Sequence, residues 1–142
     1  MLGPEQIPGR VAALDLGEVR TGVAVSDPGA ALARPLEVVS SGQLEEYLEK
    51  LLTEEEISEV VVGVPKTLGG EIGFQARRVL ERIEGLRVRF PAVRFVERDE
   101  RLTTRLAGGG REKRGRGRNR PRVDHLAAAR LLQEHLDGRN RM

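Results

Sequence analysis

The sequence predicts an α/β fold, with a mixed sheet of about five strands flanked by helices. A strand at 10–16 and a second at 20–26 are separated by a tight turn, which predicts a leading antiparallel hairpin or meander. From residue 44 onward, helical and β-type segments alternate, which is typical of parallel strands joined by helices. The 142 residues suit one domain. We expect a tail at 1–9, the domain at 10–138 and a second tail at 139–142.

Three further strands follow from the same reading. Residues 36–39 predict an edge strand, because Pro35 cannot donate to a neighbouring strand. The valine-rich run at 60–64 predicts a central strand covered on both faces. Residues 93–96 predict the last strand.

Helices are predicted where apolar residues recur at helical spacing. Leucines between 44 and 52 predict one helix, with Ser41 as its N-cap. A second begins near Phe74 and is stopped by Gly85. Thr103 or Thr104 would cap a short helix, and Pro121 suits the first turn of the last one.

The formal charge of +2 is unevenly distributed. Residues 43–59 hold seven glutamates and one lysine, whereas residues 101–122 hold eight arginines, one lysine and one glutamate. We expect 108–121 to be a flexible basic loop that holds nucleic-acid phosphates, although a solvated loop without a partner would have the same composition. Arginine's planar fork suits phosphate, but a biased genome composition explains the excess of arginine equally well. The candidate nucleic-acid-binding residues are Arg20, Arg101, Arg111, Lys113, Arg114, Arg116, Arg118, Arg120 and Arg122.

Composition excludes several classes of site. The chain has no cysteine, which excludes disulfides and zinc-thiolate centres, and its two histidines exclude a multi-histidine metal site. A bound metal would be held by carboxylates, which favours Mg²⁺ or Mn²⁺. No apolar run approaches the ~18 residues of a membrane span. Residues 1–10 lack the apolar core of a secretory signal, so we expect a cytoplasmic protein.

Aromatic residues are few. Tyr47, Phe74, Phe90 and Phe95 all fit core or edge positions, so no base-stacking platform is predicted. Recognition of nucleic acid would then depend on backbone and shape. Asp27, which precedes Pro28, is predicted to form a turn.

Acidic residues mark the candidate site. Asp15 ends the first strand beside glycines that would let a ligand approach, Asp99 and Glu100 end the last strand, and Asp124 begins the last helix. Open α/β sheets place their sites at the carboxyl ends of strands. If these ends are neighbours, the carboxylates would hold one or two metal ions that activate water for phosphodiester cleavage.

Each acid also has a structural interpretation. Asp124 would complement the helix dipole, and Asp99 would be a turn residue. Asp15 is harder to explain in this way, because an acid after a buried strand must be paired or bound. Glu97, Asp99 and Glu100 alternate in direction, so at most one or two face a shared site.

Four motifs together resemble the YqgF/RuvX-like family, whose members are described as nucleases of Holliday junctions or of the 5′ end of pre-16S rRNA. The motifs are Asp15-Leu16-Gly17 with residues 20–27, residues 61–65 followed by Gly69-Gly70, residues 99–104, and residues 123–128. The resemblance implies an RNase H-like fold and a metal-dependent nuclease centre. It assigns catalysis and metal binding to Asp15, Glu100 and Asp124, with Asp99 in reserve. Residues 106–121 are richer in glycine and arginine than the family pattern.

Two other functions remain open at this point. The hairpin at 15–24 resembles a phosphate-gripping hairpin of the actin and sugar-kinase type, but such proteins surround ATP with two lobes and this chain has room for one. A non-catalytic RNA-binding or ribosome-assembly factor would keep the acids as structural remnants. For the nuclease, the substrate would be RNA, branched DNA or both, and a two-fold symmetric junction would call for a homodimer.

Overall fold

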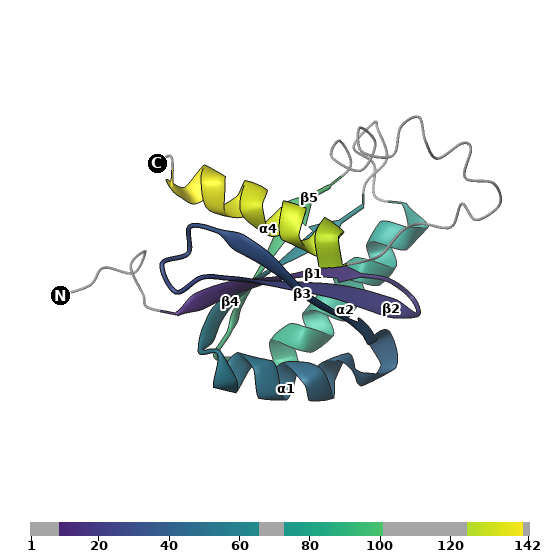
Figure 1. Cartoon of the computed structure of the whole chain (residues 1–142). Coiled ribbons are helices and arrows are strands. Elements are labelled where there is room, and N and C mark those ends of the chain that lie inside the picture. The colour runs from purple at the N-terminus through teal and green to yellow at the C-terminus, as the bar shows by residue number, and fades with distance from the viewer. Residues whose placement is uncertain (1–8, 66–72, 101–124, 141–142) are drawn as a thin grey trace.

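The computed structural model describes residues 9–65, 73–100 and 125–140, which form a five-stranded sheet with helices on both faces (Figure 1). The strand order is β3-β2-β1-β4-β5. The elements are β1 (Arg10–Leu16), β2 (Arg20–Ser26), β3 (Ala33–Ser40), the 3-10 helix η2 (Ser41–Gln43), α1 (Leu44–Glu54), β4 (Ile57–Val64), α2 (Phe74–Arg89), β5 (Arg94–Asp99) and α4 (His125–Asn140).

Strand pairing confirms the predicted mixed sheet. β1, β2 and β3 form an antiparallel meander, whereas β4 lies parallel to both β1 and β5. The strands β1, β4 and β5 therefore end at one side of the sheet, which we call the carboxyl edge.

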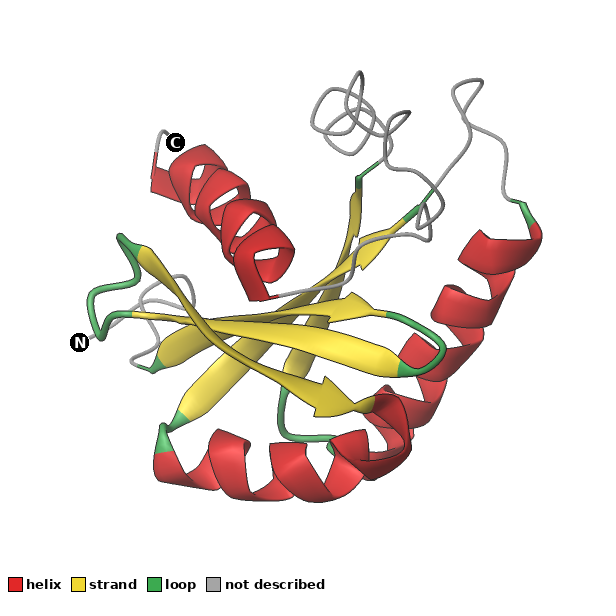
Figure 2. Ribbon diagram, turned by 45° about the vertical axis from the view of Figure 1, so that its right-hand side comes forward, coloured by secondary structure: helices red, strands yellow, loops and turns green. Residues whose placement is uncertain are grey.

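The two faces of the sheet have separate cores. Leu14 and Val62 lie on the face that packs against α1 and α2, together with apolar side chains of those helices such as Leu48 and Ile83. Ala13 and Val61 lie on the opposite face, which packs against α4. Figure 2 shows α4 alone on its side of the sheet among the described elements. Because side chains alternate along a strand, odd-numbered residues of β1 face α4.

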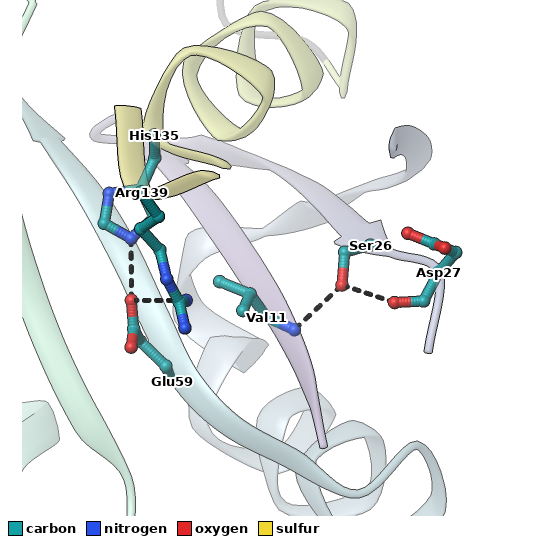
Figure 3. Close-up of polar contacts among 6 residues, drawn as sticks. All are labelled: Val11, Ser26, Asp27, Glu59, His135 and Arg139. Carbon is teal, nitrogen blue, oxygen red and sulfur yellow. Dashed lines mark hydrogen bonds and ion pairs between the residues drawn. The ribbon is translucent and has the colours of Figure 1, made fainter. Parts of the chain in front are cut away.

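Polar contacts fix the direction of α4 across the sheet. Near its end, His135 Nε2 lies 2.6 Å from Oε2 of Glu59, and Arg139 lies 3.5 Å from the same oxygen (Figure 3). The hydrogen bond with His135 holds the pKa of Glu59 below its ordinary value. Glu59 stands near the start of β4, so α4 runs antiparallel to β4 and its first residue, His125, lies toward the carboxyl edge.

At the other end of β1, the turn after β2 is locked locally. The N–H of Val11 donates to Ser26 Oγ over 3.0 Å (Figure 3). Oδ1 of Asp27 accepts hydrogen bonds from the N–H groups of Ala31 and Leu32, both at 2.8 Å. These backbone donors hold the pKa of Asp27 below its ordinary value. The turn-forming role predicted for Asp27 is confirmed.

Several element boundaries differ from those predicted. α2 continues through Gly85 to Arg89, because Ile83 and Leu86 are fully buried and anchor the helix on both sides of the glycine. The strands β3, β4 and β5 are longer than the apolar segments from which they were predicted, because hydrogen-bond pairing with neighbouring strands continues beyond those segments. The helix predicted at Thr103 or Thr104, the start at Pro121 and the loop at 108–121 lie outside the described residues.

Ser41 is not the N-cap of α1. Gln43 occupies that position, and Ser41 lies within η2 with its side chain buried. None of the described helices is long and apolar enough to cross a membrane.

Candidate active site

Asp15 lies at the carboxyl edge between two glycine positions. It pairs with Gly22 of β2, and the β1–β4 register, in which Leu14 faces Val62, brings Gly63 next on the other side. Alternation places the half-buried side chain of Asp15 on the α4 face, with Ala13. Neither glycine has a side chain to cover it, so the local sequence leaves space around this carboxylate.

Glu100 fills the space above Gly63. Its N–H donates to the carbonyl of Val64 over 3.2 Å, which extends the β4–β5 pairing one residue beyond β5. A Cβ built on Gly63 would collide with the Glu100 carboxylate. The structure therefore brings Asp15 and Glu100 to the same face and the same edge, with the missing side chain of Gly63 between their strands.

Asp99 and Glu97 belong to the opposite face. Glu97 pairs with Arg87 of α2 over 3.6 Å. Asp99 lies two residues further along β5, so its side chain points to the same face as that of Glu97. Both side chains are exposed. Of the three acids at the end of the last strand, Glu100 is the one that faces α4.

The pKa of Glu100 is raised above its ordinary value, chiefly because the carboxyl group is buried and secondly because Glu134 of α4 and Asp99 carry like charge. Carboxylate oxygens gathered at a strand end are the ligands that Mg²⁺ and Mn²⁺ prefer, and a divalent cation would offset their repulsion. Asp15 and Glu100, two carboxylates on one face of the carboxyl edge, are thus a donor set of the kind that holds a divalent metal.

Glu100→Gln is expected to stabilise the protein at neutral pH while weakening activity. A raised pKa means that the folded protein binds more protons than the unfolded chain between the two pKa values, so stability falls as pH rises through that interval. Glutamine carries no charge, so the variant avoids this loss of stability. The gain in stability should vanish at pH values below the pKa that Glu100 has in the unfolded chain. Denaturation of both proteins at several pH values measures it. Glu97→Gln is the matched control, and an equal gain in the control would contradict the explanation.

The remaining predicted site residues are only partly covered by the structure. Arg20, the first residue of β2, is exposed at the carboxyl edge and forms no ion pair with another described residue. Outside the predicted set, Nδ1 of His125 is buried and, within the described part of the chain, has no hydrogen-bond partner. Among the described residues, no group of three or more His, Asp or Glu side chains is placed to hold a metal. Residues outside the described ranges are Arg101, Arg111, Lys113, Arg114, Arg116, Arg118, Arg120, Arg122 and Asp124.

A buried hydroxyl pair supports the turn that follows Asp15. Thr21 Oγ1 and Ser41 Oγ are 2.8 Å apart, and Ser41 Oγ donates to the carbonyl of Gly17 over 2.8 Å. The N–H of Ser41 also donates to the carbonyl of Val19 over 2.8 Å. The sequence does not predict the Thr21–Ser41 contact, because the two residues are twenty positions apart and belong to no recognisable motif.

Ser41→Ala is expected to destabilise the fold by about 1–3 kcal/mol, because it leaves the buried Thr21 hydroxyl and the Gly17 carbonyl without this partner. Cleavage should fall as well, since the turn after Asp15 loses a support. Chemical denaturation measures the first effect. Ser40→Ala is the control, because Ser40 is exposed and its side chain does not cap the helix. Equal stability of the two variants would contradict the role of this pair.

Phe74 departs from the prediction that every aromatic residue fits a core or edge position. Phe95 is buried, and Tyr47 and Phe90 pack against the core. Phe74 instead is 71% exposed at the first residue of α2.

Comparison with known proteins identifies the family. A sequence model described as "RuvX: Holliday junction resolvase" matches residues 9–138. The chain belongs to the RuvX family. A Rubrobacter xylanophilus relative named "Putative pre-16S rRNA nuclease" is 65% identical over 130 residues, which cover 91% of this chain and 93% of the relative. A relative of the same name from Sulfurihydrogenibium is 37% identical and covers 90% of both chains.

Solved structures establish the fold of this RuvX-family chain. Thermus thermophilus RuvC in complex with a Holliday junction substrate superposes with a TM-score of 0.56, at 18% identity, over 93% of this chain and 96% of that one. A second structure of RuvC from the same organism has a TM-score of 0.54 at 21% identity. The fold is RNase H-like, as the four motifs implied, and the family is one of nucleases.

Proposed function

We propose that this RuvX-family chain is a divalent-metal-dependent nuclease that cleaves phosphodiester bonds in structured nucleic acid. The observation that carries the proposal is the position of Glu100, whose carboxylate lies over Gly63 on the same face and edge as Asp15. The two acids come from segments that are distant in sequence, and the missing side chain of Gly63 lets the Glu100 carboxylate lie over β4, which is a setting built for a ligand rather than for packing.

Asp15 and Glu100 would hold the metal. Asp124, which directly precedes His125 at the start of α4, would complete the ligand set, whereas Asp99 lies on the other face by strand alternation. When bound, the metal would supply an activated water and stabilise the leaving oxygen of the cleaved phosphodiester. The Asp15 and Glu100 carboxylates fix the position of that chemistry on the rigid sheet.

Arginine side chains would bind the phosphates. Arg20 is exposed at the carboxyl edge, and the basic segment between Arg111 and Arg122 separates the two parts of the proposed site in sequence. Arginine neutralises phosphate and releases counterions, so binding should weaken steeply with salt. This property alone does not separate a nuclease from a non-catalytic RNA-binding factor.

The substrate follows from the names of the relatives. They point to pre-16S rRNA, to a Holliday junction or to both, and the resemblance to the YqgF/RuvX-like family adds the 5′ end of that RNA as the place of cleavage. A two-fold symmetric junction presents two equivalent strands, so a protein that cleaves both strands needs two copies of this site. The proposal therefore includes a homodimer, located in the cytoplasm.

The test is cleavage of three labelled substrates by the purified chain: a precursor 16S rRNA 5′ fragment, a four-way DNA junction and single-stranded DNA. Each is incubated with Mg²⁺, with Mn²⁺ or with a chelator. Cleavage of at least one substrate that requires the metal supports the proposal. Salt-sensitive binding without cleavage under any condition would instead favour the non-catalytic factor.

A further inference from the structure

Phe74 is a large apolar side chain that lies outside the core formed by the described residues. The buried face of α2 consists of Ala76, Val79, Ile83 and Leu86, and Phe74 lies outside it at 71% exposure. Phenylalanine is also only a moderate helix former, so neither packing nor helix propensity accounts for it. Proteins that bind single-stranded nucleic acid present exposed aromatic side chains on which bases stack.

The ring of Phe74 is held in place from one side. The guanidinium of Arg78 lies 5.4 Å from the ring centroid, and the same arginine pairs with Glu18 over 2.7 Å. The cation covers one face of the ring, and the exposed fraction of the side chain shows that much of the rest is open to solvent. The open part of the ring is a flat apolar surface on which a planar group could stack.

This ring stands at the same edge as the two acids. Glu18 follows Asp15 by three residues, in the turn between β1 and β2, so its pairing with Arg78 ties the start of α2 to that turn. Figures 1 and 2 both show the first turn of α2 and the β1–β2 turn on one side of the molecule. Arg77, three residues after Phe74 on α2, is exposed as well.

We infer that Phe74 stacks on an unpaired nucleobase of the substrate, with Arg77 beside it to contact the adjoining phosphate. This inference rests on the proposed function and adds to it a preference for unpaired nucleotides next to the cleaved bond. A base within a duplex already stacks on its neighbours, whereas an unpaired base is free to stack on an aromatic ring. Among the described residues, Phe74 of α2 and Val19 of the β1–β2 turn are exposed large apolar side chains, and two such side chains are too few for a protein interface of about 800 Å² per partner.

A unique tryptophan tests the inference. The chain has no tryptophan, so Phe74→Trp introduces a single tryptophan at the proposed platform, whose emission is separable from that of Tyr47. Val88→Trp is the control, since Val88 is 81% exposed on the same helix. It lies fourteen residues further along, about 21 Å away at ~1.5 Å per residue. Phe74→Trp and Val88→Trp are each combined with Asp15→Asn, so that the nucleic acid stays intact. Each protein is titrated with a single-stranded 12-mer oligonucleotide and with the duplex of the same sequence.

The single strand should quench Trp at position 74 more than the duplex does, and should leave Trp at position 88 unchanged. Phe74→Leu, which keeps an apolar side chain without the ring, should weaken binding of the single strand about tenfold, or about 1.4 kcal/mol. Its affinity for the duplex should match that of the parent protein. Equal quenching at the two positions, or single-strand binding by Phe74→Leu equal to that of the parent, would overturn the inference.

The outcomes separate this inference from the proposed nuclease. If the single strand quenches Phe74→Trp in a chain that keeps the native Asp15, and that chain cleaves no substrate, the nuclease is rejected and the stacking platform is kept. Metal-dependent cleavage together with unchanged binding by Phe74→Leu would reject the platform and keep the nuclease.

Discussion

Replacing Asp15 with asparagine is expected to slow cleavage by about a thousandfold, which is about 4 kcal/mol of lost transition-state stabilisation. Asparagine keeps the shape of the side chain between Gly22 and Gly63 but removes the negative charge that would bind a divalent cation. The fold should persist, because the change reduces the negative charge near Glu100. Single-turnover cleavage measures the rate, and circular dichroism checks the fold.

Asp27→Asn is the matched control for this experiment. Asp27 makes its contacts to Ala31 and Leu32 through Oδ1, which asparagine also possesses, and it stands at the opposite end of β1. Its rate should equal that of the parent protein. Full metal-dependent cleavage by Asp15→Asn would exclude Asp15 from the metal site and remove the main support for the proposed chemistry.

Gly63→Ala is expected to abolish most of the activity with a small effect on stability. The added methyl would occupy the position of the Glu100 carboxylate, so this flexible side chain must turn away from Asp15. Because the displaced group is the far end of a half-buried side chain, the sheet itself need not move. We expect a loss of about 10²–10³-fold in cleavage, comparable to removal of one charge-stabilising group.

Gly85→Ala provides the comparison. No atom lies within 4 Å of a Cβ built on Gly85, and alanine favours a helix over glycine by about 0.5–1 kcal/mol. This variant should be slightly more stable and fully active in the same assays. If Gly63→Ala cleaves as fast as Gly85→Ala, the position of Glu100 above Gly63 has no part in catalysis.

The fold was largely readable from the chain because its signals are local. The apolar alternation at 10–16 and 20–26 and the tight turn between them define the hairpin, and the valine run at 60–64 marks a strand covered on both faces. The end of α2 was misjudged because a single glycine weakens a helix by only about 1 kcal/mol, which burial of Leu86 outweighs. The exposure of Phe74 was also missed, because helical spacing alone does not place the first residue of a helix on the buried face.

The sequence alone predicts a class of chemistry from acids at strand ends, glycines beside them, the absence of cysteine and an arginine-rich segment. The folded chain was needed to show which acid of the Asp99-Glu100 pair shares a face with Asp15, since that depends on the β4–β5 register and on the missing side chain of Gly63. The Thr21–Ser41 contact and the ring held by Arg78 and Glu18 were likewise set by packing between distant segments. Local patterns specify elements because they depend on near neighbours, whereas a site depends on distances across the sheet.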